Sequence, residues 1–151
     1  MTTSIPATLL AELGPLPIQG RAWPKAIAWL ACLVVIGIGV RLVLTASGPH
    51  GQGVSPMIIA AIVMAYVGII VMAWYMYHGQ TRITEEGISQ SWLFKRHIAW
   101  QDIRHAKFVP MLFSKRLICF PVRGRPVTFQ GSDQDVQVAF ARIALAYRHK
   151  A

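Results

Sequence analysis

Residues 57–77 read MIIAAIVMAYVGIIVMAWYMY and contain no charged residue, no proline and a single glycine, Gly68. An apolar run of more than about 18 residues is long enough to cross the hydrocarbon core of a bilayer as a helix. A helix also satisfies its own backbone hydrogen bonds, which lipid cannot do. The run ends in Trp74, Tyr75 and Tyr77, residue types that favour the membrane–water interface. The sequence therefore predicts a membrane-spanning helix over this stretch.

A second apolar run, AIAWLACLVVIGIGVRLVLTA at residues 26–46, precedes the first and is interrupted only by Arg41. At a rise of about 1.5 Å per residue, Arg41 would lie more than about 20 Å along the helix from residue 26. We expect its long side chain to extend from there toward the headgroups. An arginine inside a membrane is also a candidate functional residue, although neither run contains an acid to pair with it. A cleaved signal peptide is disfavoured because the run is long and a second span follows.

The two runs are joined by residues 47–56, SGPHGQGVSP, which contain no Lys, Arg, Asp or Glu. This link is too short to fold alone, so the spans should form a hairpin. Arg21 and Lys25 precede the hairpin and Arg82 follows it. Positively charged residues are retained on the cytoplasmic side, which predicts that both termini are cytoplasmic and that the link lies outside. We therefore place the protein in a bacterial inner membrane, with a tail at residues 1–25, the hairpin at 26–78 and a cytoplasmic domain at 79–151.

The composition agrees with this division. The 151 residues are 54% hydrophobic, only 14% are charged, and the formal net charge is +9. Soluble domains carry roughly 25% charged residues, and two spans account for the deficit. Apart from Arg21, Lys25 and Arg41, all Lys and Arg residues follow Gly79. A basic domain beside a membrane suggests anionic headgroups as partners, and nucleic acid is disfavoured because the charge is dispersed and tethered to a bilayer.

Small residues on the two spans are candidates for helix packing, because they allow backbones to approach closely. The packing would occur within the hairpin or between copies of the chain in a homo-oligomer. Cys32 in the first span and Cys119 in the domain should lie in different compartments, so we expect two buried thiols and no disulfide. The small residues are Gly37, Ala61, Ala65 and Gly68.

The tail contains a stretch, residues 7–13, that is able to form one or two helical turns, followed by Gly14, Pro15 and Pro17, which break regular structure. We favour a loosely ordered tail. The alternative is an interfacial segment that lays Leu9, Leu10 and Leu13 on the headgroups.

The remainder of the chain alternates short strand patterns with turn signals. In the first turn, Glu85-Glu86-Gly87, the glycine is expected to take a positive φ. Residues 101–103 read as a turn that places Ile103 inward, and Asp102 is expected to cap the backbone there. The strands are predicted at residues 81–84, 88–94, 97–100, 104–111, 116–122 and 127–130.

After the last strand the periodicity becomes helical. Ser132 is a good N-cap residue, and the apolar residues that follow repeat at helical spacing. The predicted domain is thus a small antiparallel sheet or barrel, closed at one open end by an amphipathic helix that buries the inner face. The stripe consists of Val136, Phe140, Ile143 and Tyr147.

The order of strands followed by one C-terminal helix is that of the pleckstrin-homology (PH) fold, and two motifs carry the resemblance. Residues 81–88, TRITEEGI, resemble the opening hairpin of bacterial PH-like membrane proteins, and residues 98–103, IAWQDI, resemble their I-x-W-x-D-I element. A two-span hairpin often precedes the domain in that family. The resemblance implies the fold and a membrane location. It implies structural roles for Gly87, Trp100 and Ile103, and it carries no catalytic residue to transfer.

Basic pairs are predicted at hairpin ends, where some of them would converge at one edge of the sheet. Near an anionic leaflet each cation would contribute about 1 kcal/mol of attraction, which would orient a domain that is already anchored. An ordinary solvated basic surface is the alternative interpretation. The candidate contact residues are Lys95, Arg96, Lys115, Arg116, Arg123 and Arg125.

The sequence contains no nucleophile motif, phosphate-binding glycine loop or metal-ligand spacing, so we expect no enzymatic activity, no cofactor and no metal. The first functional hypothesis is a non-catalytic, membrane-anchored binding or scaffold module. Its PH-like domain would contact a membrane protein partner, with lipid headgroups as secondary contacts. The second hypothesis is a small accessory or assembly subunit that acts through its transmembrane hairpin, by way of Arg41 and the small residues.

Overall fold

The structure is a computed structural model that describes residues 5–148, and it divides into two compact units. One unit is the helical pair formed by Lys25–Tyr77. The other, called the domain below, is formed by the described parts of residues 1–24 and 78–151. The domain is therefore built from two segments of chain, one that precedes the helical pair in the sequence and one that follows it.

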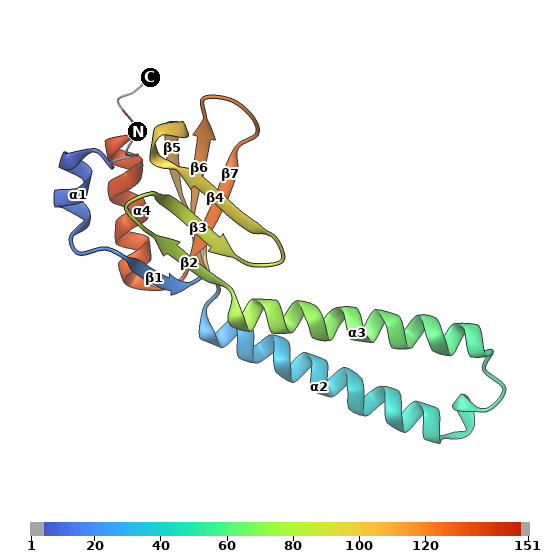
Figure 1. The fold of residues 1–151 in the computed structure, drawn as a ribbon. Helices are drawn as coiled ribbons and strands as arrows, with labels where there is room; N and C mark the ends of the chain where they lie inside the picture. Colours follow the sequence, from blue (N-terminus) through green and yellow to red (C-terminus); the bar gives the residue numbers. More distant parts are fainter. Residues whose placement is uncertain (1–4, 149–151) are drawn as a thin grey trace. The chain divides into compact units, whose positions relative to one another are not determined.

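The helical pair consists of α2, Lys25–Ser47, and α3, Pro56–His78, joined through a short 3-10 helix, η1, at Pro49–Gly51 (Figure 1). Each helix has 23 residues and a mean hydropathy of 2.5 in its most apolar window, so both are long and apolar enough to cross a membrane. The two predicted apolar helices are thus confirmed within one or two residues at each end. That they cross a membrane with the link outside stays a prediction.

The domain contains two antiparallel sheets, with strand orders β1-β2-β3-β4 and β5-β6-β7, followed by the helix α4, Gln134–Ala146 (Figure 1). The sequence predicted either a sheet or a barrel. Among the described residues the strands form two separate sheets and no closed barrel. A 3-10 helix, η2, Trp100–Asp102, connects the sheets. The strands are β1 Ile18–Arg21, β2 Gln80–Ile83, β3 Gly87–Ser91, β4 Lys95–Ala99, β5 Ile103–Pro110, β6 Lys115–Pro121 and β7 Val127–Gly131.

The core lies where α4 packs against both sheets, and it confirms the predicted apolar stripe. Val136, Phe140, Ile143 and Tyr147 are all buried. The Tyr147 ring stacks on Trp100 with centroids 6.4 Å apart, and its hydroxyl donates to the Trp100 carbonyl at 3.1 Å. Trp100 and Ile103 are also buried in the core, as predicted. These contacts hold the C-terminal end of α4 against the connection between the sheets.

The prediction of a loosely ordered N-terminal tail was wrong for the residues that the structure describes. The segment forms α1, Ala7–Leu13, which packs against α4, and β1, which pairs with β2. Leu9 and Leu13 belong to the core cluster and so do not lie on headgroups. The physical reason is that β2 and α4 would otherwise leave apolar surface uncovered, and the tail supplies the cover.

Two further expectations about local structure need correction. Gly87 does not adopt a positive φ. A Cβ on Gly87 would collide with the carbonyl oxygen of Ile98, so its role is to allow the backbones of β3 and β4 to approach. Ser132 does not cap α4 with its side chain. Its hydroxyl donates to the Arg21 carbonyl at 2.9 Å, while the Asp133 carboxylate accepts from the Arg21 N–H at 2.8 Å. Both interactions tie β1 to the start of α4.

The strand register defines two ends of the domain. At the first, the exit end, the chain leaves after β1 and returns before β2, and the Ala22 N–H donates to the Gly79 carbonyl at 3.0 Å. In the second sheet Lys115 pairs with Gly131, and the next residue, Ser132, donates its N–H to the Arg21 carbonyl, so this end of β6 also belongs to the exit end. In the first sheet the exit end is the row Arg21, Gln80, Ser91 and Lys95.

The opposite, far end contains the loop between β6 and β7. Figure 1 shows this loop at the end of the domain away from the start of β2. The strand β6 joins the two ends, and its seven residues span roughly 20 Å at about 3.3 Å per residue. Groups at the two ends are therefore too far apart to share one small ligand.

Candidate functional site

A polar pocket of about 700 Å³ lies at the far end of the domain. Its walls come from the last residues of β4, from η2, from the end of β6 and from the β6–β7 loop. The side chains with polar groups that line it are His97, Gln101, Asp102, Arg123 and Arg125, and all five residues are exposed.

The β6–β7 loop places two arginines on this pocket. Gly124 separates them and has a φ of 105°, a conformation that favours glycine because a side chain would be strained there. Within residues 5–148 neither the Arg123 nor the Arg125 guanidinium has an ion pair or hydrogen bond to another group of the chain. The loop therefore presents two guanidinium groups, which pair well with planar carboxylates or phosphates.

Asp102 is the acid of this pocket, and it reduces the positive charge there without cancelling it. Its backbone carbonyl accepts from the Val122 N–H at 2.8 Å, which fixes η2 against the start of the arginine loop. Within residues 5–148 the Asp102 side chain does not make the predicted capping hydrogen bond, and the Asp102 backbone carbonyl makes the contact instead. The pocket thus suits an anion with more than one negative group, or an acidic peptide segment.

Some of the basic pairs were expected to converge at one edge of the sheet, and the structure divides them between the two ends of the domain. Lys115 and Arg116 begin β6 at the exit end, whereas Arg123 and Arg125 follow its other end. Lys95 also lies at the exit end, as the partner of Ser91. The basic residues therefore form separate groups at opposite ends of the domain.

Arg96 has a structural contact that the sequence did not indicate. Its guanidinium Nη1 donates to the Thr128 carbonyl at 2.9 Å, so the side chain joins β4 to β7 across the two sheets. Lys95 and Arg96 were also predicted to form a turn, but both lie within β4. The turn is formed by residues 92–94 instead, because the β3–β4 ladder continues to the Ser91–Lys95 pair.

Two buried groups of the core have shifted pKa values, and neither lines the pocket. Burial raises the pKa of the Cys119 thiol from its ordinary 9.0 to about 12. Burial, with a smaller contribution from Cys119, raises the pKa of the Tyr147 hydroxyl from 10.0 to about 12. Both groups are therefore neutral at physiological pH. Cys119 is free and buried as predicted, whereas Cys32 is free and half-buried on α2.

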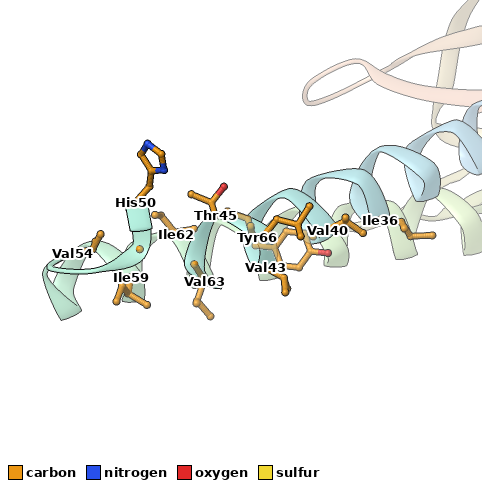
Figure 2. Close-up of a pocket in the computed structure, with 15 residues that line it drawn as sticks. Ile36, Val40, Val43, Thr45, His50, Val54, Ile59, Ile62, Val63 and Tyr66 are labelled. Atoms are coloured by element: carbon orange, nitrogen blue, oxygen red, sulfur yellow. The ribbon is translucent and has the colours of Figure 1, made fainter. Parts of the chain in front are cut away.

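The helical pair contains an apolar pocket of about 820 Å³ between α2 and α3. Figure 2 shows Tyr66 of α3 in this pocket beside Val40 and Val43 of α2. The Tyr66 hydroxyl donates to the Val35 carbonyl at 3.0 Å. A Cβ on Gly39 would meet that hydroxyl, so the glycine is what gives Tyr66 access to the carbonyl one turn earlier.

The small residues predicted to pack the helices do not do so within the hairpin. A Cβ on Gly37 or Gly68 would have nothing within 4 Å, and Ala61 and Ala65 are exposed. Their use between copies of the chain stays a prediction. Sequence reasoning missed Gly39 and Tyr66, although Tyr66 carries the only hydroxyl between Met57 and Ala73 and so was the available signal. Arg41 is exposed on α2.

Within the described residues there is no group of three or more His, Cys, Asp or Glu side chains that could hold a metal ion. Comparisons of the chain with protein-family models, with curated proteins and with solved structures found no match.

Proposed function

We propose that this protein is a membrane-anchored, non-catalytic binding module of a bacterial inner membrane. The two apolar helices form its anchor, with both termini in the cytoplasm. The domain is PH-like, and two antiparallel sheets followed by a single C-terminal helix support that assignment. Its partner is a membrane protein that offers an acidic segment, with anionic headgroups as secondary contacts.

One observation carries this proposal. The far end presents Arg123 and Arg125, without partners inside the described chain, on the rim of a polar pocket. The chain connects to the apolar helices at the other end of the domain. An anchored domain would thus hold its free arginines away from the attachment point, where an acidic segment of a neighbouring protein can reach them. Arginine is favoured over lysine for such contacts because its planar fork binds a carboxylate through two hydrogen bonds.

Charge reversal with a matched control tests the proposal. Tagged full-length protein is recovered from membranes in lipid nanodiscs, and the proteins and lipids that accompany it are identified by mass spectrometry. The variant Arg123→Glu with Arg125→Glu should lose a stoichiometric protein partner. The control Arg104→Glu with Lys107→Glu makes the same charge change at two exposed residues of β5 and should retain it.

Retention of the partner by the Arg123/Arg125 variant would contradict the proposed site. Recovery of the wild type with enriched anionic lipid and no protein partner would contradict the proposed kind of partner. Both variants change exposed loop or strand residues, so both should fold.

The second candidate function is that of an accessory subunit acting through its hairpin, and the pocket between α2 and α3 favours it. Such a pocket would accept an apolar side chain or acyl chain from a neighbour. Ile62→Trp would fill the pocket, whereas Ile70→Trp adds the same side chain at an exposed site of α3 outside it. Loss of the partner with Ile62→Trp alone, while the arginine variant keeps it, would support this function over the first.

A further inference from the structure

Two hairpin tips of the domain carry the same combination of residues. The β3–β4 turn continues into β4 as Leu93-Phe94-Lys95-Arg96, and the β5–β6 turn continues into β6 as Leu112-Phe113-Ser114-Lys115-Arg116. In each tip a Leu-Phe pair is followed by a Lys-Arg pair, and neither contains an acid. The two tips come from different sheets, so their likeness does not follow from strand pairing.

Phe94, Leu112 and Phe113 of these tips are the most exposed large apolar side chains in the described part of the domain. Leu112 is 96% exposed, Phe94 73% and Phe113 69%, and Met111 is 47% exposed beside them. Single exposed apolar residues are ordinary, but apolar residues gathered at loop tips mark interaction surfaces.

Both tips lie at the exit end. Ser91 and Lys95 flank the first tip and share a row with Arg21 and Gln80, between which the apolar helices are inserted. Lys115 flanks the second tip and pairs with Gly131, which precedes the residue bonded to Arg21. Along the chain only residues 22–24 and residue 79 separate this end from α2 and from His78 of α3.

The two tips differ from the arginine pocket in their chemistry. An interfacial segment places apolar side chains below the headgroups and cations among the phosphates, and long Lys or Arg side chains extend along apolar surface to keep their charge in water. Within the domain the Lys115 side chain reaches an aromatic ring, and its Nζ lies 5.9 Å from the centre of the Phe108 ring. Each tip thus has apolar residues in its turn and positively charged residues at the start of the strand that follows.

We infer that the β3–β4 and β5–β6 tips insert into the interface of an anionic bilayer, with Phe94, Leu112 and Phe113 below the headgroups and Lys95 and Lys115 among them. The domain then makes direct contact with the membrane in addition to its covalent anchor, and the exit end faces the lipid. This inference rests on the membrane anchor of the proposed function. It is independent of the partner that the arginine pocket would bind.

Depth measurements on the full-length protein in nanodiscs test the inference. An environment-sensitive fluorophore is attached to Leu112→Cys in a Cys32→Ala background, in nanodiscs with and without lipids that carry a shallow quencher. The control is Val122→Cys, which is 61% exposed and directly follows β6 at the far end of the domain, whereas Leu112 precedes β6 at the exit end. Cys119 is fully buried, and its raised pKa keeps the thiol protonated, so it should stay unlabelled.

The emission maximum of the label at position 112 should shift to shorter wavelength, and the quencher should reduce its emission intensity. The label at position 122 should show neither change. Equal, solution-like emission at both positions would overturn the inference. Equal quenching at position 112 in anionic and neutral nanodiscs would overturn the role assigned to Lys95 and Lys115. A label on native Cys32 in α2 reports the anchor separately: quenching there without quenching at position 112 would refute the tips and leave the anchor standing.

Discussion

The backbone N–H of Ala22 donates to the carbonyl oxygen of Gly79 at 3.0 Å, and 56 residues of chain lie between these two partners. The bond extends the β1–β2 ladder, in which Arg21 pairs with Gln80, to the point where the chain leaves the domain. The apolar helices are therefore an insertion between two strands that pair with each other. Both connections between the domain and the apolar helices therefore leave the domain at one place.

The N-terminal segment should contribute strongly to the stability of the domain. Leu9 is 1% exposed in the core under α4, and Leu9→Ala should lower the free energy of unfolding by about 2–5 kcal/mol. Leu10→Ala, one residue along at 38% exposure, should change it by no more than about 0.5 kcal/mol. Urea unfolding of the full-length protein in micelles, followed by near-UV circular dichroism, measures both. Equal effects would contradict the packing of α1 on α4.

The two glycines of α2 should respond in opposite directions to alanine. Gly37→Ala meets nothing and should raise helix stability by up to about 1 kcal/mol, the intrinsic difference between these residues. Gly39→Ala should destabilise the hairpin, because its methyl group would displace the Tyr66 hydroxyl from the Val35 carbonyl.

Tyr66→Phe removes the same hydrogen bond and should cost about 0.6–2 kcal/mol, the range for polar contacts between membrane helices. Gly39→Ala should cost less in the Tyr66→Phe background than alone, since no hydroxyl remains to be displaced. The wild type, the two single variants and the double variant form a double-mutant cycle. Their free energies of unfolding in mixed micelles give the interaction energy between residues 39 and 66. Additive effects would show that the two residues do not interact.

Gly87→Ala should lower the free energy of unfolding by about 1–3 kcal/mol, the usual cost of overpacking. The added methyl group would meet backbone atoms of Ile98 and Ala99, which cannot move aside as a side chain would. Ser91→Ala, on an exposed position of the same strand, is the control and should be nearly neutral. A neutral Gly87→Ala would mean that β3 and β4 do not approach as described.

The domain should lose stability in alkaline solution. Cys119 and Tyr147 are neutral when protonated, and burial raises the pKa of each in the folded domain to about 12. In the unfolded chain they ionise near their ordinary pKa values of 9.0 and 10.0. The unfolded state therefore releases protons first, so their contribution to stability is intact below about pH 9 and is lost as the pH rises toward 12.

Urea midpoints between pH 8 and 11.5 check this expectation. The midpoint should fall above pH 9, and Cys119→Ala should delay the fall until about pH 10, where Tyr147 begins to contribute. An unchanged onset in Cys119→Ala would show that the thiol is not the group responsible.

Much of the fold could be predicted because its signals are local. The apolar runs, the alternating strands and the stripe from Val136 to Tyr147 each follow from spacing within a few residues. The role of the N-terminal segment was missed because β1 has only four residues, and its partner β2 lies beyond the whole hairpin. Such a pairing leaves no local pattern in the sequence.

The site could be predicted only in part, because some of its contacts join residues that are far apart in the sequence. Arg123 and Arg125 were recognised as a basic turn, but the contribution of His97 and Asp102 to their pocket depends on how the sheets cross. Arg96 was assigned to a surface, whereas the packing of β4 near β7 gives it the Thr128 carbonyl as a partner. Gly39 could not be distinguished from Gly37 by spacing, since only the position of Tyr66 separates them.

Cysteine accessibility in spheroplasts tests most directly whether the domain is held at a membrane by the two apolar helices that are inserted between β1 and β2. Gln52→Cys lies between α2 and α3, and Arg123→Cys lies in the domain. A membrane-impermeant maleimide added outside inner-membrane spheroplasts should label position 52, and it should label position 123 only after lysis. Labelling of both positions before lysis, or of neither, would contradict the account.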